Sequence, residues 1–304
     1  MRVTDLRPTP TRHVSDETAR QPEAWRRAAA LVPQVADALP QPGERVAVIG
    51  CGTSWFMAEG YAVLREAAGQ GETDVFTASA LPVGRDYDRV LAITRSGTTT
   101  EVLHALGATR ARRTVLTAVS SSPVADVAEH LVGLDFADEE SVVQTVFATT
   151  ALSLLRASLG SSSADAVEVA AAQAERVLAG PAEVDLDAAG QYTFLGQGWA
   201  HGIAREAALK LREAAQLWTE SYPQMEYRHG PISIAEPGRT VWVLGDPVPG
   251  LLDDLAATGA RVVCDDLDPV ADLVRVHLLA ARRAEALGLD PDRPRHLTRS
   301  VVLG

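Results

Sequence analysis

Cysteine is scarce in this sequence and histidine is scattered, and together they exclude two kinds of site. Only two of the 304 residues are cysteines, Cys51 and Cys264, and each lies in an apolar, strand-like run. Two thiols are too few for a disulfide framework or a structural zinc site. The seven histidines show no pairs at the spacing of metal ligands. The sequence therefore predicts neither a metal nor a cofactor.

Basic residues and long apolar runs are also few. Lysine and arginine number 28 against 40 aspartates and glutamates, which gives a formal net charge of −12, and the basic residues form no long runs. Nucleic acids and anionic membranes bind to basic surfaces, so we expect neither as a partner. No stretch reaches the roughly 18 uncharged apolar residues of a membrane span, and the N-terminus lacks the apolar core of a signal peptide. These absences predict a cytoplasmic protein.

Short β-branched runs alternate with amphipathic segments along most of the chain. After a proline-rich arm and a helical segment, strand-like runs follow at 45–50, 73–81, 89–94 and 114–120. Helical patterns separate them, as at 99–113. Alternation of this kind predicts a parallel sheet covered by helices on both faces, the doubly wound α/β class.

The second half of the chain repeats the first. Segments 46–66 and 192–213 both run from a strand through Gly-x-Gly into a helix that contains Leu-Arg-Glu. Two further strand-like runs correspond at a comparable interval, 240–245 to 89–94 and 260–266 to 114–120. The sequence therefore predicts two copies of one α/β unit.

Two copies agree with the chain length, because a domain typically has roughly 150 residues. We expect an N-terminal arm and helix at 1–40, a first subdomain at 41–180 and a second at 181–304. A helical stretch at 141–159 belongs to the connection between the copies.

Hydroxyl groups and glycines gather where two of the predicted strands meet their helices, in "TRSGTTT" (94–100) and in "GCGTS" (50–54). Ligands of doubly wound sheets bind beyond the carboxyl ends of strands, and helix N-termini there attract anions. Serine and threonine are also common helix N-caps, which explains one such cluster. Two clusters, with more hydroxyls than capping needs, favour a phosphate site. A dinucleotide fingerprint is incomplete, because "GCGTSW" lacks the third glycine.

The densest group of reactive side chains lies in 205–231. Glu206, Lys210 and Glu213 are spaced i, i+4, i+7 and so share one helix face. An exposed face with an i, i+4 ion pair gives the same pattern. The Gly-x-Gly turn before this helix weakens that interpretation, because it repeats the turn of the first copy. His229 follows in the irregular loop "RHGP".

With these motifs the sequence resembles the SIS (sugar isomerase) family of phosphosugar-binding proteins, above all the isomerase half of glucosamine-6-phosphate synthase. The resemblance runs from "ETARQPEAWRR" to the C-terminus. It includes, in the family's order, "GCGTS", "SGTTTE", "EESVVQT", "EAALKLRE", "EYRHGP" and "DRPRHLTRSVVLG". It implies two tandem doubly wound SIS subdomains. We expect the glutaminase half of the synthase to be absent, because the chain starts just before the isomerase region without an N-terminal cysteine nucleophile.

The resemblance also implies roles for individual residues. Glu213 would be the base that moves a proton at C1 and C2 of an open-chain sugar, with Glu206 and Lys210 as its polar support. His229 would help to open the ring, and in the family this histidine comes from the neighbouring subunit, which implies a homodimer. The substrate-binding residues implied are Cys51, Gly52, Thr53, Ser54, Thr94, Arg95, Ser96, Thr99, Glu140, Ser141 and Arg299.

At two places the family's residue roles cannot be carried over directly to this sequence. Either Glu139 or Glu140 would contact the sugar, but an acidic run at a helix N-terminus has the same appearance. The C-terminal lysine that forms an imine in the synthase is matched by Arg299, and arginine stays protonated and cannot be that nucleophile.

The sequence therefore predicts an enzyme that opens the ring of a hexose or amino-sugar 6-phosphate and removes the C2 proton, but not a glutamine-dependent synthase. The intermediate has three fates: reprotonation to a ketose, loss of nitrogen, or expulsion of the C3 substituent. The sequence leaves these open. The alternative is a non-catalytic sugar-phosphate sensor, for which neither a helix-turn-helix nor a basic surface is found.

Overall fold

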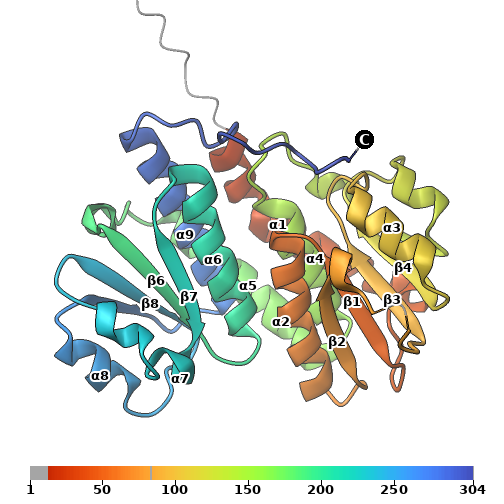
Figure 1. Ribbon diagram of the computed structural model, residues 1–304, viewed down its shortest axis with the longest axis horizontal. Coiled ribbons are helices and arrows are strands. Elements are labelled where there is room, and N and C mark those ends of the chain that lie inside the picture. Colours follow the sequence, from red (N-terminus) through yellow and green to blue (C-terminus); the bar gives the residue numbers. More distant parts are fainter. Residues whose placement is uncertain (1–12, 83, 304) are drawn as a thin grey trace, which may run out of the picture.

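Two parallel sheets enclose a layer of helices in the computed structural model, which describes residues 13–82 and 84–303 (Figure 1). The first sheet has the order β2-β1-β3-β4-β5, with β1 (Val46–Gly50), β2 (Thr73–Thr77), β3 (Arg89–Ile93), β4 (Arg112–Thr117) and β5 (His130–Gly133). The second has the order β7-β6-β8-β9, with β6 (Gln191–Gly196), β7 (Thr219–Pro223), β8 (Arg239–Leu244) and β9 (Arg261–Cys264).

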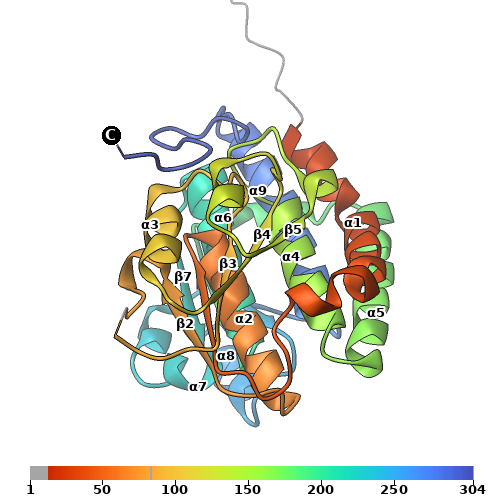
Figure 2. The ribbon, with the colours of Figure 1, turned by 90° about the vertical axis from the view of Figure 1, so that its right-hand side faces the viewer.

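Nine α-helices connect these strands in the described part of the chain. They are α1 (His13–Val35), α2 (Thr53–Ala67), α3 (Thr100–Ala108), α4 (Val146–Ala157), α5 (Ser161–Ala179), α6 (Ala200–Ala215), α7 (Gln224–Tyr227), α8 (Leu251–Ala257) and α9 (Pro269–Ala286). Figure 2 shows α1 and α5 side by side, where they pack against each other. Within the described ranges, no helix combines the length and apolarity that a membrane crossing requires.

The predicted repeat and fold class are confirmed. The order β2-β1-β3-β4 of the first sheet recurs as β7-β6-β8-β9, and all pairs are parallel. Segments 46–66 and 192–213 are the matching units β1–α2 and β6–α6. β1 to β5 fall within 41–180 and β6 to β9 within 181–304, while the boundaries themselves stay a prediction.

Three predicted elements are shorter than the pattern indicated. The run 73–81 is a strand only as far as Thr77 and then forms a 3-10 turn. The helical pattern at 99–113 ends at Ala108, because Arg112 already pairs with Arg89 in the first sheet. The stretch 141–159 becomes helical only at Val146.

Each sheet is buried on both faces, as the continuous apolar strands predicted. The inward faces, with Val48 and Leu91 from one sheet and Phe194 and Trp242 from the other, meet the helical layer. On the outer faces α3 covers the first sheet and α8 the second.

Helices α2 and α6 cross the centre of the molecule in antiparallel directions. A Cβ on Gly202 would lie 2.4 Å from the carbonyl oxygen of Phe56, so only glycine permits this approach. Arg205 pairs with Glu59 near the middle of α2. The C-terminal half of α6 therefore reaches the N-terminus of α2, and the carboxyl edges of the two sheets face opposite ends of the molecule.

Candidate active site

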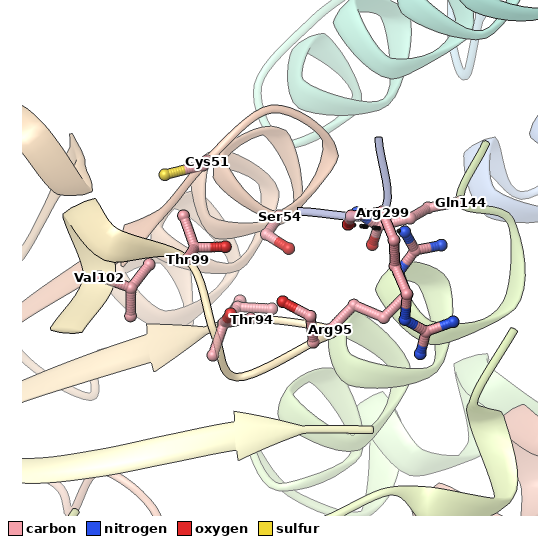
Figure 3. A pocket seen from close by; sticks show the side chains of 10 residues that line it. Cys51, Ser54, Thr94, Arg95, Thr99, Val102, Gln144 and Arg299 are labelled. Carbon is pink, nitrogen blue, oxygen red and sulfur yellow. Dashed lines mark hydrogen bonds between the residues drawn. The ribbon is translucent and has the colours of Figure 1, made fainter. Parts of the chain in front are cut away.

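A small pocket lies at the carboxyl edge of the first sheet, where β1 and β3 end (Figure 3). Its volume is about 30 Å³. It is lined by Cys51, Ser54, Ile93, Thr94, Arg95, Ser96, Thr99, Val102, Gln144 and Arg299. Seven of the predicted substrate-binding residues are therefore brought together by the fold.

The hydroxyls of this pocket are not used as helix caps. The residues that precede α2 and α3, Gly52 and Thr99, make no side-chain hydrogen bond to their helices. Ser96 Oγ accepts hydrogen bonds from the backbone N–H of Thr98 at 3.2 Å and from its hydroxyl at 3.0 Å. Two helix N-termini and a set of free hydroxyls thus converge on one small space, which is the arrangement that binds anions.

Gly97 makes the tight turn of this loop possible. Its φ is +63°, and a Cβ there would lie 1.8 Å from Ser122 Oγ. The thiol of Cys51 completes the wall near Glu101, 3.7 Å away. Burial and this carboxylate raise the pKa of Cys51 to about 11. The thiol is therefore neutral near pH 7 and is not a nucleophile.

Arg95 holds the pocket wall rather than reaching across it. Its guanidinium is buried and donates to the carbonyls of Ser141 at 2.8 Å, Val142 at 3.2 Å and Arg299 at 3.0 Å. Burial lowers its pKa. Figure 3 shows this guanidinium turned away from Ser54 and Thr99. The side chain therefore ties together two segments that are far apart in the sequence.

Arg299 lines the same side of the pocket on the C-terminal segment. Its guanidinium donates to the carboxylate of Asp138 and to the carbonyl of Glu139. Beyond it, Ser300 Oγ lies 2.9 Å from Thr98 Oγ1, and the N–H of Thr100 donates to the Val301 carbonyl at 3.2 Å. The segment thus crosses the N-terminus of α3 and borders the pocket.

A charged cluster on α6 lies beside the pocket. Lys210 Nζ is 2.6 Å from Glu213 Oε2 and 3.2 Å from Glu206 Oε1, and it donates to Thr53 Oγ1 at 3.1 Å. The side chains of Glu206 and Lys210 are 1% exposed, whereas Glu213 is 20% exposed. Because Thr53 directly precedes Ser54, one turn of α2 joins this cluster to the pocket.

Burial sets the electrostatics of the cluster. It raises the pKa of Glu206 to about 7, against the attraction of Lys210, and the charge of Glu213 raises it further. Burial alone would lower the pKa of Lys210, but the charges of Glu206 and Glu213 raise it overall. The lysine is therefore a fixed positive charge, and the exposed surface of Glu213 is the part that a small molecule can reach.

Comparisons with known proteins agree with this geometry, although no protein-family model matches the chain. The glutamine–fructose-6-phosphate aminotransferase of Methanothermobacter thermautotrophicus is 30% identical over 305 residues, which cover 86% of this chain and 52% of that protein. The corresponding protein of Sulfurisphaera tokodaii is 29% identical over 296 residues, 86% of this chain and 50% of its own length. These relatives match the SIS family that the sequence motifs resemble. It spans about half the length of these curated relatives.

Solved structures share the SIS fold over nearly the whole chain. Glucosamine-6-phosphate deaminase of Thermotoga maritima superposes with a TM-score of 0.80 at 22% identity and covers 96% of this chain and 100% of its own. The C-terminal domain of the Francisella tularensis glucosamine-fructose-6-phosphate aminotransferase gives a TM-score of 0.78 at 20% identity, with coverage of 96% and 100%. At these identities the structures establish the fold.

Four of the predicted substrate-binding residues do not line the pocket, namely Gly52, Thr53, Glu140 and Ser141. The hydroxyl of Thr53 faces Lys210 and does not line the pocket. Ser141 donates its hydroxyl to the buried carboxylate of Glu17, which also accepts the N–H of Glu140 at 2.6 Å. The side chain of Glu140 is 79% exposed and lies 3.5 Å from His13.

Glu139 serves a helix N-terminus, as one of the two interpretations of this acidic pair predicted. Its carboxylate accepts the backbone N–H groups of Thr145, Val146 and Phe147 at 2.5, 2.7 and 3.1 Å. These are the unpaired amides at the start of α4. This contact explains why α4 begins only at Val146 and not at residue 141. The residues before Thr145 form a loop that brings Glu139 back to the start of the helix.

His229 does not join the cluster within one chain. It follows α7 and is exposed at the carboxyl edge of the second sheet. Glu213 lies near the end of α6, which runs away from that edge, so the two residues are at opposite ends of the subdomain (Figure 1).

Sequence reasoning did not single out Gln144. Its side chain lines the pocket, and its Oε1 is buried without a hydrogen-bond partner among the described residues. The residue lies within the quoted motif "EESVVQT", but no feature of its type or spacing distinguishes it. An amide oxygen accepts hydrogen bonds, so this unpaired atom suits a hydroxyl or N–H donor of a ligand and not its anionic group.

The second copy differs from the first in the loop that corresponds to the pocket. The loop after β8 carries Gly245 and Asp246 in place of hydroxyl residues. Gln224 fills this edge, because it donates to the Asp246 carbonyl at 2.9 Å and accepts the Val248 N–H at 2.7 Å. One SIS subdomain therefore has the hydroxyl pocket, and the other contributes the charged helix beside it.

Proposed function

We propose that this chain is an enzyme that binds a hexose or amino-sugar 6-phosphate, opens its ring and removes the C2 proton with Glu213. One observation carries the proposal. The partly exposed carboxylate of Glu213 is held by Lys210, which is bound to Thr53, and the next residue, Ser54, lines the hydroxyl pocket. Base and anion site are thus fixed by the same turn of α2.

The pocket suits the phosphate and not the sugar. A volume of about 30 Å³ holds a small anion only, so the carbon chain would extend outward toward α6. Hydroxyls and two helix N-termini are the donors that a phosphate needs. The glutamate at the end of α6 would then meet the carbons remote from C6.

The names of related proteins support chemistry at C1 and C2. The relatives are isomerizing aminotransferases that act on fructose 6-phosphate, and the similar structures include a glucosamine-6-phosphate deaminase and a tagatose-6-phosphate ketose/aldose isomerase. A base that moves a proton between neighbouring carbons is common to these reactions.

The neighbouring charges suit Glu213 to proton transfer. Lys210 Nζ lies 2.6 Å from Glu213 Oε2 and holds this carboxylate in one orientation. Glu206 lies behind the lysine and is buried, so it cannot reach a substrate. Glu206 instead forms a second ion pair with Lys210, which holds the ammonium group in place beside Glu213.

Arg299 excludes an imine at the C-terminal segment. A guanidinium stays protonated, and here it is engaged by Asp138 and the Glu139 carbonyl. We therefore propose proton transfer without a covalent sugar adduct at this residue, followed by reprotonation, loss of nitrogen or elimination at C3. We propose that Arg299, which lines the pocket, hydrogen-bonds the sugar there.

The test is a panel of hexose 6-phosphates, with and without 2-amino or 2-acetamido groups, incubated with the protein in D2O and followed by proton NMR. At least one member should lose its C2 proton signal, and the product spectrum should distinguish ketose, deaminated sugar and dehydrated sugar. Binding of every candidate without exchange or product would contradict the proposal and support a sensor.

The pocket hydroxyls give the first prediction. Ser96→Ala and Thr99→Ala should each raise KM for the phosphosugar more than they lower kcat, because phosphate contacts bind substrate and transition state alike. We expect about a tenfold rise in KM. Thr109→Ala, in the turn after α3 and outside the pocket, is the control. An unchanged KM in both pocket variants would remove the phosphate assignment.

We also propose that the active form is a homodimer in which His229 enters the partner's site. The exposed position of His229, remote from Glu213 of its own chain, supports this arrangement. Mixing Glu213→Gln chains with His229→Ala chains should then restore activity, because half of the mixed dimers' sites contain both intact residues. Random pairing predicts recovery to roughly a quarter of the wild-type rate.

Each variant alone is the control for this experiment and should stay inactive after the same unfolding and refolding. Recovery of activity on mixing supports a shared site. If refolded mixtures form dimers by sedimentation but stay as inactive as the separate variants, His229 does not act across an interface.

A further inference from the structure

A chain of buried polar side chains crosses the helical layer. His277 on α9 is 1% exposed, and its Nδ1 lies 3.0 Å from Nε2 of Gln21 on α1. Gln21 Oε1 in turn accepts the hydroxyl of Thr149 on α4 at 3.0 Å, and Trp25 Nε1 donates to that hydroxyl at 2.9 Å. The chain thus links α9, α1 and α4.

This chain assigns the tautomer of His277. The amide nitrogen of Gln21 faces the ring and donates, because the same nitrogen lies 3.3 Å from the Thr18 carbonyl, which can only accept. His277 Nδ1 is therefore an acceptor, and the single proton of the neutral ring is on Nε2. Burial and the positive charge of Lys210 lower the pKa of His277 to about 3, so the ring is neutral near pH 7.

Two buried atoms of opposite hydrogen-bonding character are then left over near Lys210. His277 Nε2, a donor, has no partner in the part of the chain that the structure describes, and neither has Glu206 Oε2, an acceptor. The other oxygen of Glu206 is 3.2 Å from Lys210 Nζ. Helices α6 and α9, which carry the two residues, pack against each other. A buried donor and acceptor each cost free energy until they are paired.

We propose that His277 is a positioning residue for Glu206: its Nε2–H donates, through one bridging water, to the glutamate oxygen that is free of other partners. Polar buried sites of this kind hold water. The bond would stabilise the ionised carboxylate and fix its orientation, which in turn fixes Lys210 and, through it, Glu213. The effect on catalysis rests on the proposed function, whereas the effect on Glu206 does not.

Other groups also act on Glu206 and must be held constant. Lys210 and Glu213 approach it from its own helix, Thr53 approaches from α2, and Arg212 lies close enough for its pKa to respond to the glutamate. On α9, His277 is a buried group whose pKa responds to Lys210. A test therefore has to change the ring nitrogen alone and leave α6 and α2 intact.

Two conservative variants separate the ring nitrogens. The amide of His277→Asn places an oxygen where Nδ1 accepts from Gln21, but it has no donor at the Nε2 position. The longer His277→Gln places an NH2 group at the Nε2 position and loses the link to Gln21. If His277 only supports the fold, His277→Gln, which loses the link to Gln21, should be the more impaired variant. If His277 acts through Glu206, His277→Asn, which lacks the donor, should be the more impaired variant.

The first measurement needs no substrate: the carboxyl titration of Glu206 by ¹³C NMR in the full-length protein. His277→Asn should raise the midpoint by about one pH unit, because a lost hydrogen bond to the charged form raises a carboxyl pKa, and His277→Gln should stay close to wild type. Equal midpoints in all three proteins, or a shift in the glutamine variant alone, would overturn the proposal.

The second measurement is catalytic and uses whichever sugar exchanges its C2 proton. His277→Asn should lower kcat by roughly tenfold and leave KM almost unchanged, with the lower-pH limb of the rate profile moved to higher pH. His277→Gln should recover most of the loss. If no sugar is turned over, the proposed function fails, but the shift of the Glu206 midpoint would still decide the role of His277.

Discussion

Glu213→Gln is expected to reduce C2 proton exchange by about 10² or more while phosphosugar binding persists. Glutamine has nearly the size of glutamate, and its amide oxygen can still accept from Lys210 Nζ, which lies 2.6 Å from the carboxylate in the native protein. The variant therefore removes the proton acceptor and keeps the local packing. Exchange in D2O is measured by NMR, and binding by calorimetry.

The repeat provides a matched control for this variant. Glu66 occupies in α2 the position that Glu213 has in α6, the glutamate of Leu-Arg-Glu, and it accepts only the backbone N–H of Thr73. Glu66→Gln makes the same chemical change at the opposite edge of the fold and should leave exchange at the wild-type rate. Wild-type exchange in Glu213→Gln would show that another residue is the base.

Lys210→Met is expected to destabilise the fold by about 3 kcal/mol or more. The substitution leaves Glu206, which is 1% exposed, without its counter-charge in the helical layer. Urea unfolding followed by circular dichroism gives the free energy of unfolding. The double variant Glu206→Gln, Lys210→Met removes the stranded charge and should be more stable than the single variant. If the single and double variants are equally stable, the buried pair does not have this role.

The loss of stability caused by Lys210→Met should increase as the pH rises. Burial raises the folded pKa of Glu206 to about 7 from an ordinary value of 4.5, and loss of the lysine, which opposes this, raises it further. A folded state with the higher pKa binds the proton more tightly, so its stability falls as pH rises through this range. The difference from wild type should be small near about pH 5 and larger near about pH 8.

The repeated pattern and the hydroxyl clusters were readable in the sequence because they depend on neighbouring residues. Strand periodicity, the Gly-x-Gly turns and the i, i+4, i+7 spacing of Glu206, Lys210 and Glu213 are local features, and the fold confirms each of them. The resemblance added the order of the motifs. These features sufficed for the α/β class and for the family.

Apart from the local role of Glu139 at the start of α4, the contacts of the loop at 138–145 were not readable, because they depend on residues far away in the chain. Glu17 and Ser141 are separated by 124 positions, yet the carboxylate of one holds the backbone of the other. Arg95 and Arg299 meet across 204 positions. No periodicity encodes such contacts, which form only after α1 and the C-terminal segment have packed.

The antiparallel approach of α2 and α6 has a consequence for the origin of this architecture. Duplication of a gene segment ordinarily yields two equivalent active centres, each free to drift. Here the tight crossing at Gly202 brings the end of the second copy's helix to the start of the first copy's helix, so in the proposed site the two copies supply different halves. Selection then acts on the pair as one unit: the first copy is constrained to keep its hydroxyls and the second to keep its charges. The edge of the second copy, occupied by Gln224, is released from that constraint.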